Sequence, residues 1–500
     1  MTPWSVLVPF LVLGGTGLAT LVAEPFLQTQ RKHTILPWMA AVGLLLLAVV
    51  YLPMLLAGAI GDALGGMLLI GPVRAALALG ICVSALCALA GLQHALSRDE
   101  YEGGEAYALV LLASLGGLVL VHAGTSIMVF LGIELLSLPV YALVGLRRHR
   151  RDSNEALLKY FVMSAVFSAV FLYGAALSYG ATGSLAFGMP ALPDRSQLFA
   201  VGQLLMIGGL LFKLGAVPFH FWTPDAYAGA PTAVTGFMGA VVKIAGVAVL
   251  GTIWLQLVGL DRGQTPVGLS DVLAVSGLDP LLQRWSLLIV CIAMLSILLG
   301  NFSALGQQSA RRMLAFSSIA HIGYMLLALA LPSTLLADPR FSLMPLWFYV
   351  IAYAVALSGL MAGLSTVGGR EDDDSFVNIA GLARHRPYVG AVMSLCLVSL
   401  AGIPPTSGFL GKYLIFSALV RGGYTWLALA GMVLAVVGAA YYLRLLVVLW
   451  SPAPAEVAVR PVRSLNAAAL VVAAVLVLGL LLVPGLIAGP ASAAAVAAVP

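Results

Sequence analysis

Apolar stretches of about 20 residues recur along almost the whole chain, from residue 4 to residue 487. A helix of this length crosses the hydrocarbon core of a bilayer, whereas a membrane β-strand needs only about ten alternating residues. Only 9% of the residues are charged, against roughly a quarter in soluble domains, so a soluble globule is excluded. We therefore predict an all-α polytopic membrane protein. Its fourteen expected spans are residues 4–23, 35–57, 75–95, 106–122, 126–146, 155–180, 198–219, 231–259, 284–302, 313–332, 343–367, 388–419, 424–449 and 465–487.

Basic residues in the short loops predict how these spans are oriented. With the N-terminus outside, 14 lysines and arginines fall in cytoplasmic loops and six in the opposite loops. Cytoplasmic loops carry the excess of basic residues, so both termini are expected on the outer side of the membrane. The first stretch is flanked by Glu24 and lacks a basic leader, which predicts a retained span. The net charge of +5 is spread over loops, so no nucleic-acid partner is expected.

Four of the five lysines lie inside expected spans, whereas 19 of the 20 arginines lie in loops or at span ends. An ammonium group at bilayer depth costs a few kcal/mol, so it needs a wet cavity, an anionic partner or loss of its proton. Arginine stays charged, while a buried lysine can release and rebind a proton. This partition favours a proton path through Lys159, Lys213, Lys243 and Lys412.

Glu134 is the only acid near the middle of a span. It lies at a depth similar to that of Lys213 on a neighbouring span, and each precedes a proline by five residues. A static ion pair between two helices is the structural alternative to a proton switch. Lys243 could instead extend toward the headgroups, but its central position argues against that. Lys412 follows a helix break where freed carbonyls and water could hydrate it, which suggests an exit role.

Three further residues are weaker candidates for the same path. Lys159 lies about one helical turn from a cytoplasmic loop, so it either extends to that surface or joins the path. His220 follows Lys213 by seven residues, which predicts the same helix face. His321 lies within an apolar stretch. An intramembrane histidine can shuttle protons near neutral pH, but it can also be a hydrogen-bonded core residue.

Prolines interrupt the seventh and twelfth expected spans, at Pro218 and at Pro404 and Pro405. Proline removes a helix hydrogen bond, so both spans are predicted to be discontinuous. The two spans are five apart and cross the membrane in opposite directions, which is typical of inverted repeats. The predicted organisation is helices 1–3 in residues 1–105, a first five-helix repeat in 106–259, a second in 260–450, and a last helix in 451–500.

The sequence offers no framework for a bound cofactor or metal. No glycine-rich nucleotide loop or cluster of metal ligands occurs in a convincing setting. The four cysteines lie in apolar runs without paired spacing and are expected to be small core residues. We therefore expect no cofactor, no metal and no redox centre in this chain.

Five segments together resemble one family of membrane proteins. These segments are FLGIELLSLPVYALVG, NEALLKYFVMSAVFSAVFLYGAALSYGATGSL, FKLGAVPFHFWTPDAYAGAPTAVTGFM, RRMLAFSSIAHIGYMLLAL and SLAGIPPTSGFLGKY. They extend over most of residues 106–450. They resemble the antiporter-like subunits of respiratory complex I, the bacterial proton-translocating NADH:quinone oxidoreductase, and within these the subunit N family.

The resemblance implies roles for particular residues. Glu134 and Lys213 match a glutamate and a lysine that pair in this family, and Lys243 and Lys412 match its lysines of the eighth and twelfth spans. Lys159 aligns with a lysine of the sixth span. The segment 225–229 reads Asp-Ala-Tyr-Ala-Gly, where the family usually has PDVYEG or PDVYQG, so its polar contacts differ.

The resemblance also implies a function. The chain is expected to move protons from the cytoplasm to the outer side of the bacterial inner membrane, as a subunit of an enzyme whose quinone and redox centres lie in other subunits. Its expected partners are the other membrane subunits, the lipid bilayer, protons and internal water. A subunit of a multi-subunit cation/proton antiporter is the alternative, because it would use the same spans and lysines. A single-chain solute transporter is a further class, and it would need a substrate-sized pocket.

Overall fold

The computed structural model describes residues 3–98, 103–189, 191–192, 194–257, 279–330, 343–367, 374–452 and 462–482. Helices dominate these residues, and twelve of them are long and apolar enough to cross a membrane. The prediction of an all-α polytopic membrane protein is confirmed.

The first part of the bundle runs up to the end of the eighth expected span. Its elements are α1 (Pro3–Ala23), η1 (Glu24–Phe26), α2 (Thr29–Leu56), β1 (Gly61–Ala63), β2 (Leu68–Ile70), α3 (Pro72–Arg98), α4 (Glu105–His122), α5 (Ser126–Val144), α6 (Arg151–Thr182), α7 (Ser196–Leu214), α8 (Thr223–Gly229) and α9 (Thr232–Leu257).

The second part contains the remaining expected spans. Its elements are α11 (Asp279–Leu305), α12 (Ala310–Leu327), α14 (Met344–Leu364), α15 (Phe376–Ile379), α16 (Leu382–His385), α17 (Pro387–Ala401), α18 (Ser407–Arg421), α19 (Thr425–Trp450) and α20 (Ser464–Leu482).

Each expected span coincides with a helix or with a broken pair of helices. The two predicted discontinuous spans are observed as the pairs α7 with α8 and α17 with α18. Twelve helices meet the length and apolarity of a span, and α12 and the short apolar α17 are the additional candidates. The count of fourteen crossings and the two inverted repeats therefore stay predictions. The ends of three expected spans, at residues 258–259, 331–332 and 483–487, lie outside the described residues.

Within the residues that the structure describes, a small β-hairpin departs from the predicted all-helical chain. Strands β1 and β2 pair antiparallel, with Gly61 opposite Ile70. Gly65 and Gly66 both have positive φ in the turn between them, a conformation that glycine adopts without steric cost. The hairpin lies between α2 and α3. Its strand pairing gives hydrogen-bond partners to backbone N–H and C=O groups that would lack them in an irregular loop.

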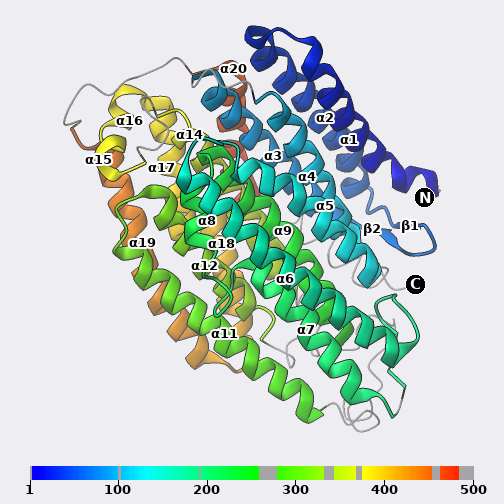
Figure 1. Ribbon diagram of the computed structural model, residues 1–500. Helices are drawn as coiled ribbons and strands as arrows, with labels where there is room; N and C mark the ends of the chain where they lie inside the picture. The colour runs from blue at the N-terminus through cyan, green and yellow to red at the C-terminus, as the bar shows by residue number, and fades with distance from the viewer. Residues whose placement is uncertain are drawn as a thin grey trace.

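The centre of the bundle is formed by α9 and α14, which pack against each other and against α3 (Figure 1). The most apolar stretches of α9 and α14 are completely buried, because both helices are apolar all round. By contrast, α1 and α19 bury only 28% of theirs and lie at the outside. Three cysteines are buried as expected, but Cys291 on α11 is exposed, so the prediction that all four are core residues is wrong.

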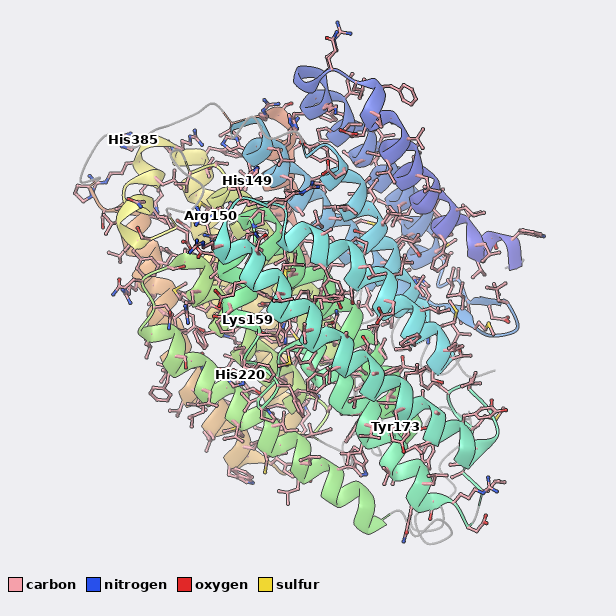
Figure 2. All side chains as sticks on the ribbon, in the orientation of Figure 1. His149, Arg150, Lys159, Tyr173, His220 and His385 are labelled. Atoms are coloured by element: carbon pink, nitrogen blue, oxygen red, sulfur yellow. The ribbon has the colours of Figure 1, made fainter. Side chains whose placement is uncertain are left out.

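The loop before α6 and the end of α16 lie toward the same end of the bundle. Figure 2 shows His149, Arg150 and His385 near that end. Which end faces the cytoplasm stays a prediction. The acidic run at residues 371–373 and the loop residues Arg262, Arg340, Arg370 and Arg460 lie outside the described part of the chain.

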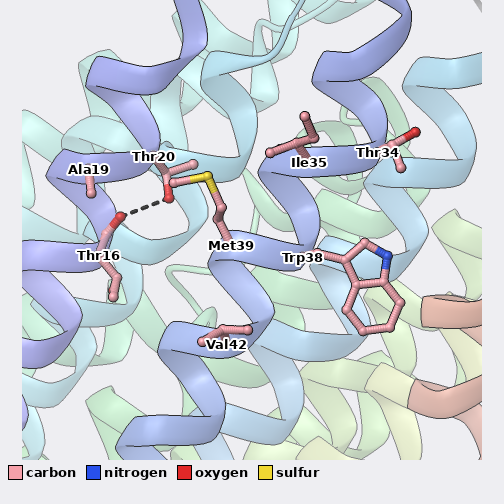
Figure 3. A pocket seen from close by; sticks show the side chains of 8 residues that line it. All are labelled: Thr16, Ala19, Thr20, Thr34, Ile35, Trp38, Met39 and Val42. Carbon is pink, nitrogen blue, oxygen red and sulfur yellow. Dashed lines mark hydrogen bonds between the residues drawn. The ribbon is translucent and has the colours of Figure 1, made fainter. Parts of the chain in front are cut away.

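An open apolar groove of about 560 Å³ lies between α1 and α2 on the surface of the bundle (Figure 3). Thr16 and Thr20 line it, but their hydroxyls donate to carbonyls of their own helix, Val12 at 2.9 Å and Thr16 at 2.7 Å. The groove therefore presents a mainly apolar wall. Its lining residues are Thr16, Ala19, Thr20, Thr34, Ile35, Trp38, Met39 and Val42.

Candidate proton-relay site

Lys213, in the last turn of α7, is held by hydroxyl groups from two neighbouring helices. Its Nζ donates to Ser137 Oγ of α5 at 2.5 Å, and to Tyr160 OH and Ser164 Oγ of α6 at 3.1 and 3.2 Å. The side chain is only 4% exposed, and its ammonium lies over the rings of Tyr141 and Tyr160. These neutral hydroxyl groups surround the ammonium and take the place of water or a counter-ion.

Glu134 does not make the direct contact with Lys213 that the sequence and the resemblance led us to expect. Among the described residues, no ion pair joins these two side chains. Glu134 is half-buried, on a stripe of α5 where Leu131 and Leu138 are exposed. Ser137, one turn further along α5, contacts the ammonium instead. In this structure Glu134 is therefore near the site without bonding to Lys213, and the pairing stays a prediction.

The hydroxyl groups around Lys213 belong to a pattern that the sequence analysis missed. Tyr160, Ser164 and Ser168 follow one another at intervals of four residues on the buried face of α6. This spacing places all three on one side of a helix. Hydroxyl residues at helical spacing inside an apolar span were the signal that could have located this part of the site.

A second lysine, Lys243, caps the helix end at the first break. Helix α7 ends at Leu214, and Gly215 follows in the left-handed conformation with φ of 68°. Trp222 Nε1 donates to Phe212 O at 2.9 Å, and Lys243 Nζ donates to Leu214 O. The freed carbonyls thus gain partners, and a cation is placed at the negative end of the helix dipole.

Lys243 is buried in α9 with 1% of its surface exposed, so it does not extend to the headgroups. Gly215 has no side chain, and this leaves room for the Lys243 ammonium. A Cβ at this position would lie 2.5 Å from Thr223 Oγ1 and 3.4 Å from Lys243 Nζ. Only glycine combines this backbone conformation with such a close approach. Lys243 and Thr223 therefore flank the same point of the break.

The second break repeats this chemistry. Helix α17 ends at Ala401, and Gly402 follows in the left-handed conformation with φ of 79°. Lys412 of α18 donates to Leu400 O at 3.1 Å and to Ala401 O at 2.9 Å. Its ammonium also lies 5.3 Å from the centre of the Tyr324 ring. In both halves a buried lysine therefore caps the carbonyl end of a broken helix, whereas the relay or exit role of Lys412 stays a prediction.

His321 of α12 is buried between two tyrosines that the sequence analysis did not single out. Its Nδ1 hydrogen-bonds Tyr349 OH and its Nε2 hydrogen-bonds Tyr442 OH, each at 2.7 Å. A neutral imidazole donates through one nitrogen and accepts through the other. A proton taken up at one side of the ring can therefore be released at the other. Tyr442 also hydrogen-bonds Ser317, which extends the polar chain.

A second polar cluster lies between His321 and Lys412. Tyr441 donates to Asn301 Oδ1 at 3.1 Å, and Asn301 Nδ2 contacts Tyr324 OH at 3.2 Å. Tyr324 is the residue whose ring faces the Lys412 ammonium. The second half of the bundle thus holds a nearly continuous set of polar groups inside apolar helices. We call Lys213, Lys243, His321 and Lys412 the relay row.

Lys159 lies outside the relay row. It forms ion pairs with Glu155 at 2.7 Å and with Asp225 at 2.9 Å, and half of its side chain is exposed (Figure 2). Arg312 approaches Asp225 from α12 at 4.0 Å. Of the two alternatives for Lys159, the structure supports the surface position. The ion pairs of Asp225 also supply the polar contacts of the segment that departs from the family pattern.

His220 does not share a helix face with Lys213, and the prediction that it does is wrong. Helix α7 ends at Leu214, so His220 lies in the irregular turn before α8 (Figure 2). It is partly exposed, and its Nδ1 atom has no hydrogen-bond partner among the described residues. The left-handed Gly215 redirects the chain and cancels the seven-residue spacing.

A buried ion pair that the sequence analysis missed ties the two halves together. Arg311, at the start of α12, lies 3.2 Å from Asp374 and donates to Ala230 O at 2.6 Å. Asp374 also accepts from the backbone of Arg311 and from Ser309. Burial alone would raise the pKa of Asp374, but the Arg311 charge and these hydrogen bonds outweigh it and hold the pKa below its usual value. Ala230 lies between α8 and α9, so the pair fixes the first break against the second half.

The fold and the relay row define an antiporter-like membrane protein. The family model described as "NADH:quinone oxidoreductase/Mrp antiporter, TM" matches residues 123–262 and 265–438. The chain belongs to this family. The matched residues hold both broken helices and every member of the relay row.

Within this family, the chain is similar in sequence to proteins named NADH-quinone oxidoreductase subunit N. NADH-quinone oxidoreductase subunit N of Salinibacter ruber is 35% identical over 462 residues, which cover 91% of this chain and 86% of that protein. Subunit N of Thiobacillus denitrificans is 37% identical over 404 residues, covering 79% of this chain and 78% of the relative.

Solved structures show the same likeness. A chain of respiratory complex I from Thermus thermophilus with bound aureothin superposes with a TM-score of 0.77 at 33% identity, covering 96% of this chain and 98% of that one. The Mrp complex from Dietzia contains a chain with a TM-score of 0.80 at 21% identity, covering 100% of this chain and 98% of that one. The second likeness shows a shared fold.

Proposed function

We propose that this chain carries protons from the cytoplasm to the outer side of the bacterial inner membrane as subunit N of NADH:quinone oxidoreductase. The relatives named subunit N and the Thermus thermophilus complex I structure support this assignment. Quinone reduction would take place in other subunits, which drive this chain through electrostatic and conformational coupling.

One observation carries the proposal: three lysines lie inside the bundle with neutral partners. Lys213, Lys243 and Lys412 are each less than 10% exposed, and among the described residues none of them contacts a carboxylate. A structural role would be better served by apolar residues or by closed ion pairs. Buried lysines held by hydroxyls and carbonyls can lose a proton and regain it as neighbouring charges change.

The proposed route follows the relay row. A proton from the cytoplasmic side loads Lys213 or Lys243, passes His321 and reaches Lys412, from which it leaves to the outer side. At each transfer one group loses a proton and the next gains it, so no charge is created along the path. The contact between Glu134 and Lys213 would form and break during turnover, and the structure described here has it open.

The test is Lys213→Ala in the assembled complex. We expect the complex to assemble while proton pumping and coupled quinone reduction fall by well over half, because the hydroxyl cage loses the group that it serves. Proton uptake into inverted membrane vesicles and NADH-driven quinone reduction are the measurements. Lys32→Ala is the matched control, because Lys32 pairs with Glu24 at 2.5 Å, outside the relay row. Wild-type pumping by Lys213→Ala would defeat the proposal.

A subunit of a cation/proton antiporter is less well supported. The Dietzia structure shares the fold at 21% identity, whereas the subunit N relatives are 35% and 37% identical. Sodium transport by membranes that contain the complex, measured without NADH, separates the two functions. Sodium flux that persists without NADH and disappears in Lys213→Ala would favour the antiporter.

A further inference from the structure

The groove between α1 and α2 has an arginine at one end. Arg31 lies in the first turn of α2, and Thr34, Ile35, Trp38 and Val42 follow it at intervals of three or four residues. Residues at this spacing share one face of a helix, so Arg31 is in line with the groove wall that Figure 3 shows. Side chains in a helix lean toward its N-terminus, and an arginine at the end of a span extends its charge to the headgroup layer.

This end of the groove carries a net positive charge. Arg31 is exposed, and no hydrogen bond or ion pair holds it among the described residues. Its neighbour Lys32 is neutralised by Glu24 at 2.5 Å, and the first turn of α2 holds no acidic residue. Arg463 donates to His33 O at 3.3 Å, so a second guanidinium lies near the same turn. The guanidinium of Arg31 is therefore available to an anion from outside the chain.

The opposite end of the groove is closed by a close approach of the two helices. A Cβ at Gly43 would lie 2.6 Å from Thr16 Oγ1, so a larger residue there would push α1 and α2 apart. Thr16 and Val42 line the groove beside this contact. The eleven residues from Arg31 to Val42 span roughly 16 Å at about 1.5 Å per residue. Half of a hydrocarbon core of about 30 Å is about 15 Å, so the groove has the depth of one leaflet.

A phospholipid fits this shape better than a helix of another protein does. A transmembrane helix crosses both leaflets, whereas the groove ends near the middle of the membrane. An acyl chain reaches from the headgroup layer to that depth, and it would restore the dispersion contacts that an unfilled groove loses. The planar guanidinium of an arginine matches the oxygens of a phosphate group. We propose that the groove binds one acyl chain of an anionic phospholipid, with the lipid phosphate on Arg31.

The groove wall and the arginine have different effects on binding. Ile35, Trp38 and Val42 can contact the acyl chain of any phospholipid, so they give no preference for a headgroup. Arg31 attracts a headgroup with a net negative charge more strongly than a zwitterionic one, in which a second group offsets the phosphate charge. A preference for anionic lipid therefore distinguishes the proposed site from ordinary contact with the bilayer.

The test uses the assembled complex in nanodiscs of phosphatidylcholine that contain a small fraction of phosphatidylglycerol with a photoreactive diazirine on one acyl chain. After illumination, mass spectrometry of peptides from α1 and α2 measures labelling of the groove. We expect several-fold more labelling than by phosphatidylcholine that carries the same diazirine at the same fraction. Arg31→Gln should lower the phosphatidylglycerol labelling to the phosphatidylcholine level, whereas Arg31→Lys should retain most of it.

Arg421→Gln is the matched control. Arg421 is also exposed at a helix end and has no ion pair among the described residues, but it lies on α18, which packs against α14 and α19. Its substitution should leave the labelling of α1 and α2 unchanged. Equal labelling by the two lipids, or labelling that Arg31→Gln does not lower, would overturn the proposed site. Absence of groove labelling by either lipid would overturn it too and would indicate that a helix of another subunit covers the groove.

A second pair of variants tests the groove if Arg31→Gln fails to assemble. Ala19 lines the groove, so Ala19→Phe places a ring where the acyl chain would lie. Leu18 is exposed on the same helix and is not part of the groove lining, which makes Leu18→Phe the control. Labelling by phosphatidylglycerol should fall several-fold in Ala19→Phe and stay at the wild-type level in Leu18→Phe. Wild-type labelling of Ala19→Phe would contradict the proposal, and the proposed function would stand, because proton pumping is not the readout.

Discussion

Lys213 differs from the two lysines that close the helix breaks in the kind of group that holds it. Its partners are hydroxyls, which can both accept and donate a proton, whereas Lys243 and Lys412 bond to carbonyls, which can only accept a hydrogen bond. A proton leaving Lys213 therefore has protein groups to receive it. Lys243 and Lys412 have no such group among their hydrogen-bond partners.

Asp374 gives a prediction about pH and stability. Its pKa in the folded protein lies below the usual value of 3.8, so its pairing stabilises the fold fully above about pH 4 and the contribution is lost as the pH falls further. Asp374→Asn leaves Arg311 buried without a counter-ion and should cost about 3 kcal/mol at pH 7, the low end for a buried pair because Asp374 is partly exposed. Thermal inactivation of the complex in detergent is the measurement.

The difference between wild type and Asp374→Asn should shrink as the pH is lowered below 4, because the wild-type carboxylate is then protonated too. Asp152→Asn is the control, since Asp152 pairs with Arg150 at the exposed surface and should change stability little. A difference that stays constant from pH 7 to the acid limit would contradict this assignment.

At the scale of elements, the two broken helices solve the same problem. An interrupted helix inside a membrane exposes carbonyls that neither lipid nor the next turn can satisfy. Here a lysine bonds to those carbonyls at both breaks, Lys243 of α9 at the first and Lys412 of α18 at the second, next to a left-handed glycine. The capping role and the relay role therefore belong to the same ammonium group, and a single substitution to alanine removes both.

Lys412→Arg separates the two roles. The guanidinium can still donate to Leu400 O and Ala401 O, but it keeps its proton under all working conditions. We expect normal amide protection at Gly402 and Ile403, whose N–H groups bond Val398 O, together with a several-fold loss of pumping. Lys412→Met should lose both. Hydrogen exchange read by mass spectrometry, combined with vesicle pumping, gives the comparison, and full pumping by Lys412→Arg would rule out a relay role.

At the scale of the whole molecule, the relay row crosses the bundle where α9 and α14 exclude lipid completely. If protons pass through its members in series, blocking one of them blocks all flow. The double variant Lys213→Ala with Lys412→Ala should then pump no worse than the more severe single variant. Proton uptake per NADH oxidised is the measurement. Losses that multiply would instead indicate two independent routes, one in each half.

The sequence by itself determined the membrane class, the approximate spans, both helix breaks and the depth of three lysines. These features depend on local quantities, namely the length of apolar runs, the lack of an N–H in proline and the cost of burying a charge. They hold whatever the neighbouring helices are. The same reasoning singled out His321, but it could not name the two tyrosines that hold it.

Only the tertiary structure decided which groups meet. Lys159 lies at the surface because it pairs there with Asp225 of a distant segment. His220 lies off the helix face of Lys213 because the chain changes direction at the left-handed Gly215. Arg311 and Asp374 are 63 residues apart and lie in what read as separate loops. Contacts of this kind depend on how helices pack against one another, and residue spacing within one helix carries no information about them.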